Sequence, residues 1–156
     1  MTASMSALLR LWFQGVRGLQ WLQPAALLAA RLYVAHAFFL SGLTKLRDWD
    51  ITLALFADEY AVPLLSPEVA AYAGTAGELV LPVMLALGLG GRFAAIGLSI
   101  LNAVAVLSLS EIAPAALQQH WLWGSLLALI VLWGPGAWSL DRWLTPHLEA
   151  RAHGRD

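Results

Sequence analysis

Residues 92–110 read RFAAIGLSILNAVAVLSLS, and no charged residue follows Arg92 in this stretch. A transmembrane helix needs about 20 predominantly apolar residues, so this stretch is long enough to cross a bilayer. A second uncharged stretch, from Ile112 to Leu140, follows almost at once. Backbone that is exposed to lipid must satisfy its hydrogen bonds internally, so both stretches are predicted to be helical.

The composition of the whole chain indicates a membrane protein. Of its 156 residues, 60 % are hydrophobic and 12 % are charged, and the mean hydropathy is +0.69. Soluble domains carry about 25 % charged residues, so the lipid bilayer is the expected main solvent and partner. A net charge of −1 gives no field that would attract a nucleic acid. Because the chain has no cysteine, disulfides, thiolate metal sites and thiol relays within it are excluded.

Four segments predict an all-α integral membrane four-helix bundle within residues 24–144. The spans are expected at about residues 24–44, 69–89, 92–110 and 118–138. Residues 1–23 place Arg10 and Arg17 among apolar side chains, which predicts an N-terminal interfacial helix. In the long first connection, Asp50 is expected to cap a short helix over Ile51–Tyr60 that lies against the outer mouth of the bundle. Residues 145–156 are predicted to form a cytoplasmic tail.

The basic residues near the span ends predict the orientation. Two, Lys45 and Arg47, fall on one side, and six fall on the other: Arg10, Arg17, Arg92, Arg142, Arg151 and Arg155. Because basic residues are enriched in cytoplasmic segments, both termini are predicted to be cytoplasmic, in a bacterial inner membrane. The long first loop then faces outward.

Polar residues within or beside the spans are the candidate site residues. A charge inside a span costs about 2.5–3.5 kcal/mol on insertion scales, so such groups normally face the bundle and have a partner. Counted from the cytoplasmic ends of their spans, Arg31 lies about 10 Å deep and Glu78 about 16 Å deep. The six candidates for a ligand or proton site are Arg31, His36, Lys45, Glu78, Asn102 and His120.

Two interpretations of these residues remain open at this point. Arg31 and Glu78 are expected to contact each other, either as a structural ion pair or as a binding site for a polar ligand, a proton or a quinone head group. Asn102 can serve helix packing, and Lys45 can be an anchor that extends to the interface. No metal site is expected, because the four histidines have no ligand-like spacing.

Several of these elements together resemble the DoxX family. They are the stretch RLYVAHAFFLSGLTKLRDW at residues 31–49, the loop from Tyr60 to Pro67, Glu78, and the turn LGLGGR at residues 87–92. The resemblance covers about residues 29–109 and implies a small four-helix inner-membrane protein. Arg31, Lys45 and Glu78 match the family pattern. The lack of cysteine departs from any member that uses thiol exchange.

The resemblance implies a membrane subunit rather than an enzyme that is catalytic alone. Relatives include membrane subunits of oxidoreductases of the thiosulfate:quinone type. Other relatives belong to redox-stress systems or accompany enzymes that modify metal-binding peptides. A quinone-linked redox subunit with a partner protein is therefore one hypothesis. A small transporter or ion-pathway component, acting as a homo-oligomer, is the second. A non-catalytic assembly subunit of a peptide-modification or metal-stress system is the third.

Overall fold

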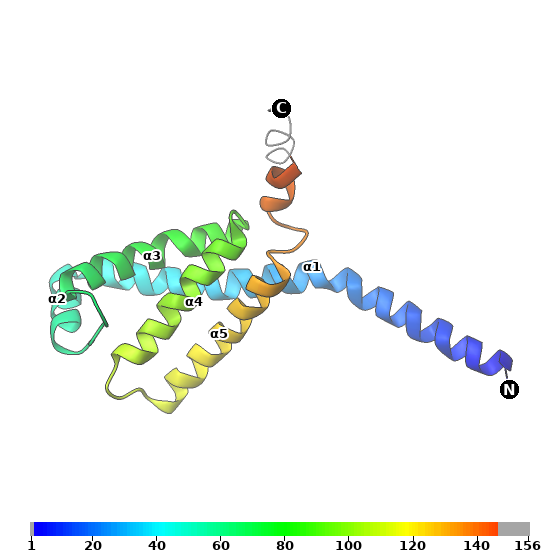
Figure 1. The fold of residues 1–156 in the computed structure, drawn as a ribbon, viewed down its shortest axis with the longest axis horizontal. Coiled ribbons are helices and arrows are strands. Elements are labelled where there is room, and N and C mark those ends of the chain that lie inside the picture. Colours follow the sequence, from blue (N-terminus) through cyan, green and yellow to red (C-terminus); the bar gives the residue numbers. More distant parts are fainter. Residues whose placement is uncertain (1, 147–156) are drawn as a thin grey trace.

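The computed structural model describes residues 2–146, and this part of the chain forms helices α1 to α5, a further helical segment at residues 141–146 and no strand (Figure 1). Four of them, α1, α3, α4 and α5, are long and apolar enough to cross a membrane. The protein is thus a helical membrane bundle, as predicted. The bounds are α1 Thr2–Arg47, α2 Trp49–Asp58, α3 Pro67–Leu87, α4 Gly91–Ser108 and α5 Pro114–Trp133.

Helix α1 is continuous where the sequence predicts an interfacial helix followed by a separate span. It contains 46 residues, with Pro24 inside it. At 1.5 Å per residue it is about 69 Å long, whereas the hydrocarbon core of a bilayer is about 30 Å thick. Its N-terminal part extends well beyond the other helices (Figure 1). We call residues 2–23 the N-terminal arm.

Helix α2 folds back along α3 instead of extending away from the bundle. Its N-cap is Asp48, whose Oδ1 accepts a hydrogen bond from the Ile51 amide at 3.1 Å, so the prediction of Asp50 as cap was wrong. Phe56 of α2 is buried with Ala70 and Ala71 of α3. Helix α2 therefore packs on the first half of α3.

The register between α1 and α3 is fixed at two glycines, and the two helices run side by side (Figure 1). A β-carbon on Gly42 of α1 would lie 3.1 Å from Cβ of Glu78. At the other end of α3, Gly88 adopts a left-handed φ of 66° and lies directly against the Arg31 side chain. Arg31 therefore stands opposite the end of α3, and Gly42 opposite its middle.

The segment after α5, residues 134–146, folds back over the hairpin between α3 and α4. We call it the C-terminal strap. Its amides at Leu140 and Asp141 donate to Leu87 O at 3.1 Å and Gly88 O at 2.9 Å. The Asp141 carboxylate in turn accepts hydrogen bonds from the Gly90 and Gly91 amides, at 2.7 and 2.8 Å. These contacts close one end of the bundle around the strap.

The two ends of the bundle differ in charge. One, the basic end, holds Arg31, Arg92 and Arg142 together with the C-terminal strap. The opposite one, the acidic end, holds α2 and the connections between α2 and α3 and between α4 and α5. Its carboxylates at the ends of the spans or outside them are Asp48, Asp50, Asp58, Glu59, Glu68 and Glu111.

Candidate functional site

A cavity of about 370 Å³ lies within the acidic end and is lined by residues from all five helices. Most of its wall is apolar. The polar exceptions include a cation, a carboxylate, a tyrosine and a histidine. The lining residues are Ser41, Lys45, Phe56, Tyr60, Val62, Pro63, Leu65, Ala70, Ala73, Gly74, Glu78, Ile100, Leu101, Val104, Ala105, Ser108, Leu109 and His120.

Lys45 and Glu78 form an ion pair in this cavity. Nζ of Lys45 lies 2.5 Å from Oε2 of Glu78 and donates a second hydrogen bond to Oγ of Ser41 at 3.0 Å. The two charged side chains are only 20 % and 14 % exposed. An ammonium group has three N–H donors, so the third remains for another acceptor. The pair thus offers a bound molecule both a donor and a carboxylate acceptor.

His120 is oriented by Asn102, which is buried on α4. The Asn102 amide nitrogen donates to the His120 backbone carbonyl at 3.0 Å, which turns Oδ1 of Asn102 toward Nδ1 of the ring at 2.8 Å. An amide oxygen only accepts hydrogen bonds, so Nδ1 carries the proton. Nε2 of a neutral His120 is then an acceptor. Asn102 orients His120 by these two hydrogen bonds. It therefore has both the packing role and the site role considered for it.

The connection between α2 and α3 covers the cavity and brings Tyr60 to it. The Ala61 amide donates to Ser108 O at 2.9 Å, which ties this loop to the end of α4. Burial raises the pKa of the Tyr60 phenol, and the negative charges of Glu59 and Glu78 raise it further. Tyr60 is therefore a neutral hydrogen-bonding group at physiological pH.

Arg31 does not contact Glu78, so the predicted pair between them was wrong. Arg31 is fully buried at the basic end, where its Nη2 donates to the backbone carbonyl of Trp138 in the C-terminal strap. Gly42 of α1 stands opposite Glu78, and Arg31 lies eleven residues before Gly42. At 1.5 Å per residue this separates Arg31 from the level of Glu78 by about 16 Å.

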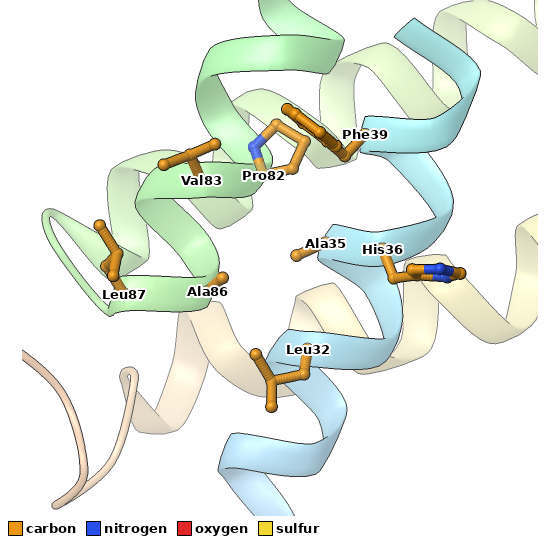
Figure 2. Close-up of a pocket in the computed structure, with 8 residues that line it drawn as sticks. All are labelled: Leu32, Ala35, His36, Phe39, Pro82, Val83, Ala86 and Leu87. Carbon is orange, nitrogen blue, oxygen red and sulfur yellow. The ribbon is translucent and has the colours of Figure 1, made fainter. Parts of the chain in front are cut away.

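His36 lies outside the cavity as well. It borders a different, almost wholly apolar groove of about 310 Å³ between α1 and α3. Figure 2 shows the ring of His36 pointing away from α3, whereas Phe39 and Leu32 turn toward that helix. The structure brings three of the six candidates, Lys45, Glu78 and His120, to one cavity.

With this geometry established, the chain can be compared with known proteins. The family model for DoxX matches residues 26–111, which is more than half of the 156-residue chain. The protein belongs to the DoxX family. The resemblance seen in the sequence is thereby confirmed. Neither the curated proteins nor the solved structures give a match.

The DoxX match includes Lys45 and Glu78 as well as Arg31, but it ends before α5. His120 and the C-terminal strap therefore lie beyond the matched residues. The cavity thus combines a DoxX ion pair with a histidine from a helix outside the match.

The sequence interpretation missed Ser41 and Tyr60 as cavity residues. Ser41 could have been predicted from the sequence, because it precedes Lys45 by four residues and so lies on the same face of the helix. Tyr60 could not have been predicted in this way, since it reaches the cavity only because α2 folds back on α3.

Proposed function

We propose that this DoxX protein is a membrane subunit that binds a quinone head group in the cavity at the acidic end. The observation that carries the proposal is the Lys45–Glu78 pair, which lies in a mostly apolar cavity within a membrane bundle. Ligand sites commonly combine an apolar wall with a few converging polar groups, and this cavity has that character.

The polar groups fit the two redox forms of such a head group. A quinone presents carbonyl oxygens that accept hydrogen bonds, and the remaining N–H of Lys45 is available to donate one. A quinol presents hydroxyl groups that donate, and Glu78 and Nε2 of His120 are acceptors. When bound, the group would supply two-electron chemistry linked to proton uptake and release. Lys45 and Glu78 can position it and hold the protons.

The apolar lining fits the rest of the molecule. Phe56, Leu101 and Val104 line the cavity, and they can contact a hydrophobic ring or chain without loss of hydrogen bonds. The chain has no cysteine, so we assign the electron centre to a partner protein. In this proposal, the chain holds the quinone while the partner delivers or removes electrons.

We further propose an inner-membrane location with both termini in the cytoplasm, on the basis of the basic end and the acidic end. Arg92 and Arg142 belong to the basic end, and the charge bias of membrane proteins places such an end in the cytoplasm. A cysteine introduced at position 2 should stay unlabelled by an impermeant reagent in intact cells. Labelling there would reverse the orientation.

Quinone binding by the purified protein in detergent tests the functional proposal. Organic extraction should recover quinone, and a short-chain quinone should quench tryptophan fluorescence with saturation. Lys45→Gln and Glu78→Gln should each weaken this binding at least tenfold. The matched controls are Arg47→Gln and Glu68→Gln, which change exposed charges of the same kind at the same end and should bind as the wild type does.

Two results would contradict the proposal. The first is the absence of saturable quinone binding by the wild type. The second is equal binding by the Glu78→Gln and Glu68→Gln variants. Ion flux in proteoliposomes that depends on Glu78, without quinone binding, would favour the transport hypothesis in its place.

A further inference from the structure

A second pocket, of about 410 Å³, lies at the basic end, far along the bundle from the proposed quinone site. It is formed where α4 begins, α5 ends and the C-terminal strap passes between them. Six of its lining residues matter here: Arg92, Phe93, Trp133, Asp141, Arg142 and Thr145. It contains no residue of the cavity that holds Lys45 and Glu78.

Two cationic side chains in this pocket are available to bind a ligand. Asp141, its one carboxylate, accepts hydrogen bonds from the Gly90 and Gly91 amides with both oxygens. The first amides of α4 are thus occupied by the protein itself and are not offered to an anion. Arg92 and Arg142 are exposed and have no hydrogen bond or ion pair within residues 2–146. An anion would therefore be bound by the arginines.

The Arg92 guanidinium lies beside Gly134. A β-carbon on Gly134 would lie 3.6 Å from Nη2 of Arg92, so the guanidinium lies close over the backbone at the end of α5. Gly134 has a φ of 83°, a conformation that side-chain-bearing residues rarely adopt. A cation at a helix C-terminus is also favoured by the helix dipole. The Arg92 guanidinium therefore lies beside the end of α5, where the helix dipole favours a cation.

The surroundings of the pocket match a lipid rather than a soluble anion. Trp133 is 70 % exposed and Phe93 66 % exposed, and both stand at the ends of membrane-spanning helices. Tryptophan at this depth is typical of the membrane interface. Along the same two helices the exposed apolar side chains that acyl chains would cover include Ile96, Ile100, Leu129 and Leu132. The arginines thus lie at headgroup level above a lipid-facing surface.

We propose that this pocket binds the phosphate headgroup of an anionic phospholipid. Arg92 and Arg142 neutralise the phosphate, and Trp133 and Phe93 flank the glycerol and upper acyl chains. Basic pockets between helices are known to select such headgroups. The bound lipid would link α4, α5 and the C-terminal strap at the basic end.

A lipid-binding measurement tests this site. The full chain is delipidated in detergent, and its binding of phosphatidylglycerol is compared with its binding of phosphatidylcholine. The wild type should prefer phosphatidylglycerol, measured by native mass spectrometry and by a rise in Tm on lipid addition. Arg92→Gln/Arg142→Gln should reduce its affinity for phosphatidylglycerol about 25-fold, since each basic residue contributes about fivefold. Arg47→Gln, which removes an exposed arginine at the acidic end, should leave it unchanged.

A charge-conserving variant separates binding from folding. Arg92→Lys/Arg142→Lys should keep most of the preference, because a lysine also attracts phosphate. An equal preference in the wild type and in Arg92→Gln/Arg142→Gln would overturn the proposal. So would equal retention of the two lipids by the wild type. Protection by glycerol phosphate as strong as that by phosphatidylglycerol would replace the lipid with a free anion and would equally overturn it.

Discussion

The two ends of the bundle use buried charge in opposite ways. At the basic end, Arg31 is fully buried and its Nη2 donates to the backbone of the C-terminal strap, while its Nε and Nη1 have no hydrogen-bond partner among the described residues. Both oxygens of Asp141 are used by the start of α4. At the acidic end, Lys45 and Glu78 pair beside a cavity and keep unused hydrogen-bonding capacity. The two ends therefore differ in access. The unused hydrogen-bonding groups of Arg31 are enclosed by protein, whereas those of Lys45 and Glu78 border a cavity that a ligand can enter.

Loss of Arg31 should have the largest effect on stability. Arg31→Leu removes the hydrogen bond to Trp138 O and leaves Asp141 without its nearby cation. A hydrogen bond to a charged group contributes about 1.5–3 kcal/mol to the free energy of unfolding, and the space left by the fully buried side chain adds a cavity cost. Thermal unfolding in detergent measures this, with Arg47→Leu as an exposed control. A loss below about 1 kcal/mol would mean that Arg31 does not hold the basic end together.

Gly88→Ala should be the next most damaging change. Gly88 has a φ of 66°, and an added β-carbon would collide with the Arg31 side chain and lie 2.9 Å from Cα of Ser139. We expect a loss of about 2–3 kcal/mol, from the left-handed backbone and the collision together. Gly18→Ala is the matched control, because no atom lies within 4 Å of a β-carbon there. Equal Tm values for the two variants would refute this account of the hairpin.

The ion pair at the acidic end should show a smaller, coupled effect. In a double-mutant cycle, Lys45→Met and Glu78→Leu should couple by about 1–3 kcal/mol, because their charges are in contact and only partly exposed. Arg31→Leu and Glu78→Leu should instead be additive within about 0.5 kcal/mol, as expected for distant sites. Strong coupling between Arg31 and Glu78 would contradict the register described for α1 and α3.

The smallest effect should appear at alkaline pH and involve Tyr60. The fold raises the pKa of this phenol above its ordinary value of about 10, so the folded state keeps its proton longer than the unfolded state does. The stabilisation is complete below that ordinary value and is lost as the pH rises through the folded pKa. Tm measured from pH 8 to 11 should therefore fall less steeply for Tyr60→Phe than for the wild type. Parallel curves would show that Tyr60 does not titrate in this way.

Much of the fold could be predicted from the sequence, because lipid imposes strict rules on length and polarity. The four spans and the short helix beside Asp48 follow from uncharged runs, prolines and a capping residue. The predicted boundary at Pro24 was wrong, because the alanines, leucines and glutamines on both sides favour helix and α1 continues through the proline.

The error about Arg31 and Glu78 has a definite physical origin. Depth was counted from the ends of apolar segments, as though each span began at the same level. In the structure, α1 continues past the bundle, so the end of α3 lies opposite Arg31 and not opposite Pro24. Gly42, near the end of α1, lies opposite Glu78 in the middle of α3, and this brings Lys45 within reach of the Glu78 carboxylate. Lys45 can pair with Glu78 only because of how α1 is aligned with α3 in the fold. Counting the depth of each residue within its own span does not give this alignment.

We propose that the acidic end binds quinone and that the basic end stabilises the fold. Quinone affinity and Tm, measured together on Glu78→Gln and Gly88→Ala, test this difference most directly. Our account predicts that Glu78→Gln weakens binding at least tenfold while its Tm falls less than that of Gly88→Ala. It predicts that Gly88→Ala lowers Tm by several degrees while the folded protein binds with unchanged Kd. Unchanged affinity in Glu78→Gln, or weakened binding by folded Gly88→Ala, would contradict it.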